Sequence, residues 1–133
     1  MIRGLKVALI LFGVISILSG LAHIIAPYQL ASMIGFGEIP DVCRPIAYVM
    51  AMVGISFIAP GVWLIVAGRD PLRHITWVKF AILWCILAVV AGLYSIIQGV
   101  VSFNQVGMVI ILDGVFAAAF LVFYPWRAAR GSR

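Results

Sequence analysis

Two ionisable side chains lie inside strongly apolar stretches of the sequence, and they are the first candidates for chemistry. Asp113 lies about seven residues into an apolar segment over residues 106–126, which is roughly 10 Å along a helix that rises 1.5 Å per residue. His23 lies near the end of another apolar segment, residues 5–26. Because an acid inside an apolar helix is costly and usually faces other helices, we expect Asp113 to point into a bundle.

The neighbours of these two residues indicate which helix faces are internal. Ser16, Ser19, Gly20 and His23 follow the i, i+3, i+4, i+7 spacing of one helix face, so this small, polar face should point inward. The face around Asp113 is also small and allows another helix to approach; it contains Gly114, Ala117 and Ala118. If the two segments are neighbours, His23 can pair with Asp113. The other residues of this predicted polar cluster are Ser19, Tyr94 and Gln98.

Two interpretations of the polar cluster remain open. It is either a proton-handling or ligand-binding site near one membrane face, or a structural hydrogen bond that sets helix register. The sequence contains no ligand cluster for a metal, and we assign no catalytic residue. Catalysis by Cys85 would need a thiolate in the bilayer, which is disfavoured. His23 and His74 should fall at opposite membrane faces, so one haem cannot use both. The sequence implies no cofactor, although a quinone or another lipid is compatible with the cluster.

The elements that position these residues are four long apolar segments. Of 133 residues, 65% are hydrophobic and 10% are charged, whereas a soluble domain has about 25% charged residues. A spanning helix needs about 20 apolar residues, and barrel strands would alternate apolar and polar positions. These segments are apolar at consecutive positions. We therefore predict an all-α integral membrane four-helix bundle, a single domain with spans at residues 5–26, 45–68, 75–98 and 106–126.

The distribution of basic residues predicts the orientation of the bundle. Arg44 alone falls on one side of the four spans, and eight basic residues fall on the other: Arg3, Lys6, Arg69, Arg73, Lys79, Arg127, Arg130 and Arg133. Under the positive-inside rule, both termini are cytoplasmic and the helices run up-down-up-down in a bacterial inner membrane. An aromatic belt should mark the inner face: Trp63, Trp77, Tyr124 and Trp126. Because the charges flank apolar segments, the net charge of +5 does not indicate nucleic-acid binding.

The connections between the spans and an internal sequence similarity complete the expected architecture. Residues 27–44 should form a long outer loop whose part 28–34 is a short helix along the membrane surface, and the other two connections are short. Gly20 and Gly92 begin similar hexapeptides, and Gly61 and Gly114 begin similar tripeptides. A duplicated two-helix unit would explain both similarities, although glycine also recurs by chance in membrane helices.

The sequence resembles the DoxX-like superfamily of small bacterial four-helix membrane proteins. The resemblance rests on hydropathy and on a few motifs: Ser19-Gly20-Leu21, Pro27, Leu30-Ala31, Gly35, Arg44 before the second segment and Arg69-Asp70-Pro71 after it. It implies a four-helix bundle, and some relatives are associated with membrane redox complexes, including quinone-linked thiosulfate oxidation and thiol stress responses. No catalytic residue carries over.

Two functions fit these observations best, and a third, a small oligomeric transporter or channel, fits least well because the spans contain few polar residues. The leading hypothesis is a non-catalytic subunit or accessory protein of a larger membrane complex, with a membrane protein or a second copy of the chain as partner in the bilayer. The resemblance implies that this complex is a redox complex. The alternative is a small redox enzyme or a quinone- or lipid-binding module that uses the polar cluster in the outer half of the membrane.

Overall fold

The computed structural model describes residues 2–33 and 45–126, and the regular structure of these residues is entirely helical. The helices are α1 (Ile2–Ile25), α2 (Pro27–Met33), α3 (Pro45–Arg69), α4 (Ile75–Ile97) and α5 (Phe103–Phe123). All except α2 are long and apolar enough to cross a membrane. The chain is therefore an α-helical, multi-pass membrane protein.

The helix bounds follow the predicted spans closely in the middle of the chain and less closely at its ends. α3 and α4 begin at the predicted residues, whereas α1 and α5 each begin three residues earlier. Hydropathy detects the apolar stretch, but a helix can extend into polar sequence beyond it. At the start of α5, for example, the Ser102 N–H donates to Gln105 Oε1 at 2.8 Å, which is half of a capping box.

The short helix expected after the first span is present as α2. α1 ends at Ile25, and α2 begins at Pro27, where the fixed φ of proline suits a first helical turn. The rest of the predicted outer loop, residues 34–44, lies outside the described residues, and so do Gly35, Cys43 and Arg44.

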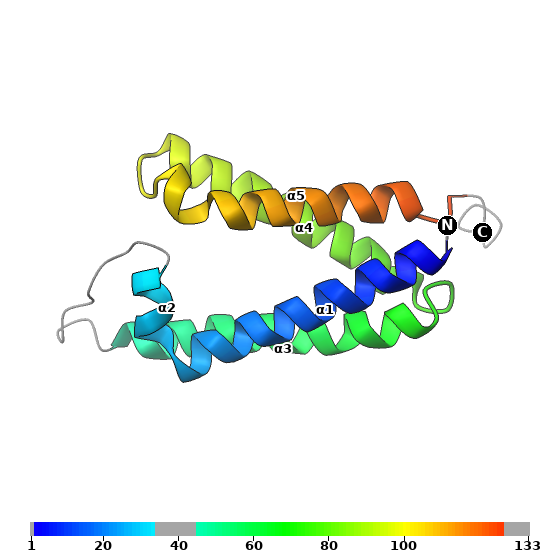
Figure 1. Cartoon of the computed structure of the whole chain (residues 1–133), viewed down its shortest axis with the longest axis horizontal. Coiled ribbons are helices and arrows are strands. Elements are labelled where there is room, and N and C mark those ends of the chain that lie inside the picture. The colour runs from blue at the N-terminus through cyan, green and yellow to red at the C-terminus, as the bar shows by residue number, and fades with distance from the viewer. Residues whose placement is uncertain (1, 34–44, 127–133) are drawn as a thin grey trace.

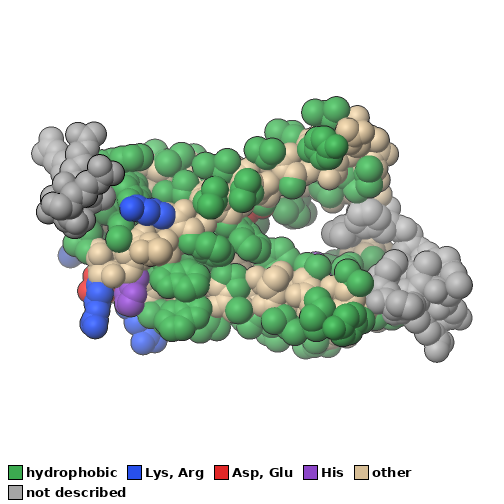
Figure 2. Space-filling model, turned by 180° about the vertical axis from the view of Figure 1, so that it is seen from behind, with side chains coloured by type: hydrophobic (Ala, Val, Ile, Leu, Met, Phe, Trp, Pro, Cys, Tyr) green, Lys and Arg blue, Asp and Glu red, His purple; other side chains and the backbone are tan. Residues whose placement is uncertain are grey.

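Successive long helices run in opposite directions and form two pairs, α1 with α3 and α4 with α5 (Figure 1). α1 begins, and α5 ends, at the same end of the molecule. Lysine and arginine side chains gather there (Figure 2), so we call it the basic end; its described basic residues are Arg3, Lys6, Arg69, Arg73 and Lys79. We call the opposite end the far end.

Glycines bring α1 and α3 into close contact. A Cβ added to Gly20 would lie 2.5 Å from the Gly54 carbonyl oxygen, and one added to Gly13 would lie 2.7 Å from the Gly61 carbonyl oxygen. Only a hydrogen atom fits at these positions. Such small residues allow membrane helices to approach closely and gain van der Waals contact.

The α4–α5 pair has glycines at three of the four positions that correspond to the glycines of the α1–α3 pair. An offset of 72 residues relates α1 to α4, and one of 53 relates α3 to α5; under these offsets Gly13, Gly20, Gly54 and Gly61 correspond to Cys85, Gly92, Gly107 and Gly114. Three of the four glycines recur, which supports a duplicated two-helix unit. The exception is Cys85, whose side chain is fully buried in the core.

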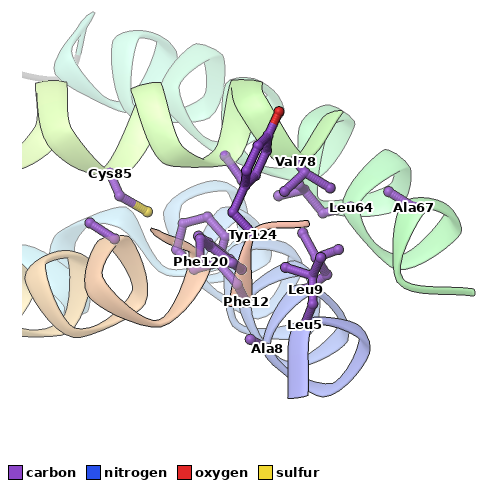
Figure 3. Packing of buried hydrophobic residues seen from close by; sticks show 12 residues of the cluster. Leu5, Ala8, Leu9, Phe12, Leu64, Ala67, Val78, Cys85, Phe120 and Tyr124 are labelled. Carbon is purple, nitrogen blue, oxygen red and sulfur yellow. The ribbon is translucent and has the colours of Figure 1, made fainter. Parts of the chain in front are cut away.

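The hydrophobic core joins the two pairs in the basic half of the molecule (Figure 3). Its members come from the halves of α1, α3, α4 and α5 nearer the basic end, and from the residue that follows α5: Leu5, Ala8, Leu9, Phe12, Leu64, Ala67, Val78, Ala81, Cys85, Ala117, Phe120 and Tyr124. Toward the far end, the space-filling view is hollowed between the described parts of the two pairs (Figure 2). The packing between the pairs is therefore uneven along the helices.

Candidate functional site

Asp113 is buried midway along α5, with 8% of its surface exposed. Its inward position agrees with the expectation from its small neighbours. It lies deeper than predicted, because α5 begins at Phe103 and ten residues correspond to about 15 Å of helix. Among the described residues, Ser16 is the other buried polar side chain.

The polar neighbour of Asp113 is Cys85 of α4, which has 0% of its surface exposed. The Cys85 thiol lies beside the Asp113 carboxyl group, close enough for the two to interact, and Figure 3 shows the Cys85 side chain pointing from α4 toward α5. The sequence analysis considered Cys85 as a disfavoured catalytic thiolate and missed this pair. A signal was present, since both residues lie near the middle of consecutive, antiparallel segments.

His23 makes its hydrogen bond within its own helix. Its Nδ1 donates to the Ser19 carbonyl oxygen at 2.7 Å, and its ring lies against Phe57 of α3 with centroids 5.6 Å apart. His23 lies near the far end of α1, whereas Asp113 is midway along α5. No hydrogen bond joins the two residues in the part of the chain that the structure describes.

The other predicted members of the cluster lie elsewhere. Tyr94 is on the surface of α4 with 61% exposed, and Gln98 is the exposed C-cap residue of the same helix. Ser16, on the predicted polar face of α1, donates to the Phe12 carbonyl oxygen at 2.8 Å. Ser16 and His23 are thus satisfied within their own helix, Tyr94 and Gln98 are exposed, and these side chains do not converge on one site.

The described residues offer no metal centre. They contain no group of three or more His, Cys, Asp or Glu side chains that could hold an ion. His74 precedes α4 at the basic end and His23 is near the far end, so the two histidines lie at opposite ends of the helices, as expected.

The small residues beside Asp113 lie partly in the interior and partly on the surface of the protein. Ala117 is buried with Asp113, whereas Ala118 is exposed and Gly114 is partly exposed. We had expected these residues to share the internal face. The difference arises because consecutive helical residues are about 100° apart, so Asp113 and Gly114 face different surroundings.

Gly114 differs from the other described glycines in helices. A Cβ added to any of the others would meet an atom of another residue at 2.5–2.9 Å, but one added to Gly114 would meet nothing within 4 Å. Gly114 and Ala118 are one turn apart, which is the small-xxx-small spacing found where membrane helices pack. We call this pair the open small patch of α5, because no other described part of the chain covers Gly114 and Ala118 is exposed.

The aromatic residues of the predicted inner belt pair at the basic end. The rings of Trp63 and Trp77 stack with centroids 5.6 Å apart and an interplanar angle of 7°. The rings of Tyr124 and Trp126 meet edge to face at 4.7 Å. Amphipathic rings at this level are typical of the membrane–water interface.

Comparisons of the chain with protein-family models, curated proteins and solved structures find no match. Inferences about function therefore rest on the residues of this chain.

Proposed function

We propose that this chain is a non-catalytic subunit or accessory protein of a larger membrane complex, and that a transmembrane helix of its partner packs on the open small patch of α5. The observation that carries the proposal is the open space at Gly114. The other described helical glycines have a contact within the chain that accounts for their lack of a side chain. Gly114 has none, so a partner from outside the chain would account for it.

The physics of helix association in a bilayer supports this proposal. Lipid tails are as apolar as leucine, so membrane helices associate through close packing rather than through the hydrophobic effect. Gly114 and Ala118 would let a partner backbone approach α5 closely. The patch borders the buried Asp113–Cys85 pair, which lies between the two helices of the α4–α5 pair on which the partner would dock.

The same proposal includes an orientation and a location. The five described basic residues at one end support a cytoplasmic position for that end under the positive-inside rule. Both chain termini would then be cytoplasmic, in a bacterial inner membrane. The DoxX-like resemblance supports a redox complex as the class of partner.

The alternative, a quinone- or lipid-binding enzyme built on His23, Asp113 and Tyr94, has less support. These side chains make their described contacts on three different surfaces: with Ser19 and Phe57, with Cys85, and at the exterior of α4. No specific observation favours a shared ligand.

The test is purification of the tagged full chain from its native cells in a mild detergent. We expect a different membrane protein to co-purify, and Gly114→Leu or Ala118→Leu to reduce its recovery at least about fivefold, the effect of losing roughly 1 kcal/mol of packing. Ala91→Leu is the matched control, because Ala91 is an exposed alanine of α4 outside the patch, and it should leave recovery unchanged.

Two results would contradict the proposal. If the chain is recovered without any other protein, it has no stable partner. If the chain is recovered only with a second copy of itself, the protein is a homo-oligomer and not an accessory subunit of another complex. The yield of monodisperse protein should be equal for all variants, since Gly114 and Ala118 make no tight contact within the chain.

A further inference from the structure

A groove lies on the outer surface of the α4–α5 pair at the basic end. Its volume is about 280 Å³, and it is lined by Lys79, Ile82, Leu83, Ile86, Leu121, Tyr124 and Trp126. Leu83, Ile86 and Leu121 are exposed, so the groove opens sideways, toward the space that hydrocarbon occupies around a membrane protein. Its lining surface is almost entirely apolar, and the lining residues that carry polar side-chain atoms, Lys79, Tyr124 and Trp126, lie toward the basic end.

Lys79 provides a positive charge at the polar part of the groove. It is in the second turn of α4 and is exposed, and it has no hydrogen bond or ion pair with another described residue. A lysine at this level extends its ammonium group to the interface while its methylene stem lies along the apolar surface.

Tyr124 provides a hydrogen-bond donor next to this charge. Its side chain is 5% exposed, its hydroxyl group points away from the core (Figure 3), and it makes no hydrogen bond to another described residue. Trp126 closes the same part of the groove. Its Nε1 donates to the Leu121 carbonyl oxygen at 3.2 Å, which holds the indole ring in place beside Tyr124.

We propose that this groove binds an anionic phospholipid. The headgroup phosphate contacts the Lys79 ammonium group and the Tyr124 hydroxyl group, and an acyl chain lies along Ile82, Ile86 and Leu121. The pattern fits this ligand because a cation and a donor mark the headgroup level, and apolar side chains continue from there toward the membrane interior. A partner helix would leave the charge of Lys79 unpaired, whereas an anionic lipid neutralises it.

The experiment is native mass spectrometry of the detergent-purified full chain titrated with phosphatidylglycerol or phosphatidylcholine of the same acyl chains. We expect the first phosphatidylglycerol to bind more tightly than phosphatidylcholine. Lys79→Ala should weaken that first binding about fivefold, the effect of one basic residue near the membrane surface, and Lys79→Arg should preserve it. Leu83→Trp, which fills the groove from an exposed position, should also weaken it without changing the charge.

Arg73→Ala is the matched control, because Arg73 is an exposed basic residue at the same end but outside the groove. It should leave the first binding unchanged. Equal losses for Lys79→Ala and Arg73→Ala would overturn the proposal in favour of general charge attraction. Equal binding of the two lipids by the unmodified chain would overturn it as well, and neither result would bear on the partner that we propose for the open small patch.

Discussion

At the scale of single residues, polar groups within the helices find partners close at hand. Ser16 and His23 donate to carbonyl oxygens one turn earlier in their own helix, a common solution for side chains in an apolar setting. An ionised Asp113 cannot donate a hydrogen bond to a carbonyl oxygen of its own helix. The side chain with which it interacts is Cys85 on the neighbouring helix α4. The interaction between Cys85 and Asp113 thus links α4 with α5 through polar side chains.

This link predicts different effects for two substitutions of Cys85. Cys85→Ser retains a donor of similar size, so its stability should stay close to that of the unmodified chain. Cys85→Val removes the donor and leaves the carboxyl group unsatisfied, which should cost about 1–3 kcal/mol. Thermal unfolding in detergent, followed by tryptophan fluorescence, measures the difference. In an Asp113→Leu background the advantage of serine over valine should disappear, and its persistence would show that the hydrogen bond is not the cause.

At the scale of elements, glycines decide how closely the helices approach. α1 and α3 touch through backbone atoms at Gly13, Gly20, Gly54 and Gly61. In α4 and α5 the corresponding glycines meet side chains instead: Gly92 faces Ile110, and Gly107 faces Phe103 of its own helix. The second pair is therefore packed through side chains, and one of its glycines is left open.

The contrast predicts opposite results for the same chemical change at two glycines. Gly20→Ala places a methyl group 2.5 Å from the Gly54 carbonyl oxygen, so α1 and α3 must move apart, and overpacking of this kind costs about 1–3 kcal/mol. Gly114→Ala meets nothing within 4 Å and should leave the stability of the isolated chain unchanged or slightly higher, because alanine favours helix. The midpoint of thermal unfolding distinguishes the two variants, and equal losses would refute this assignment of the contacts.

At the scale of the whole molecule, packing and charge are both unequal between the two ends. The core joins the helix pairs in the basic half, and the described basic residues lie at the same end. The proposed lipid groove is there as well, while the open small patch begins at the middle of α5. The molecule therefore offers a lipid-binding surface at one membrane face and a helix-packing surface within the membrane.

The proposed orientation predicts which end a reagent reaches first. In a background with Cys43→Ser and Cys85→Ser, Val100→Cys places a thiol in the turn at the far end, where Val100 is 75% exposed. Arg73→Cys places one in the exposed turn at the basic end. A membrane-impermeant maleimide should label the first variant in intact spheroplasts and the second only after lysis. The reverse pattern would place the basic end outside.

The count of long helices and the clustering of charge at one end follow from local sequence. Helix formation over 20 apolar residues depends on backbone hydrogen bonds within each segment, so hydropathy alone locates α1, α3, α4 and α5 to within a few residues. The contacts among side chains depend instead on the rotation of each helix about its axis. A residue turns through about 100° relative to its neighbour, so Asp113 can face Cys85 while Gly114 is open. Tertiary packing, set by Gly13, Gly20, Gly54 and Gly61 in one pair and by Cys85 in the other, decided this rotation, and for that reason the sequence analysis located Asp113 in the interior but not its partner.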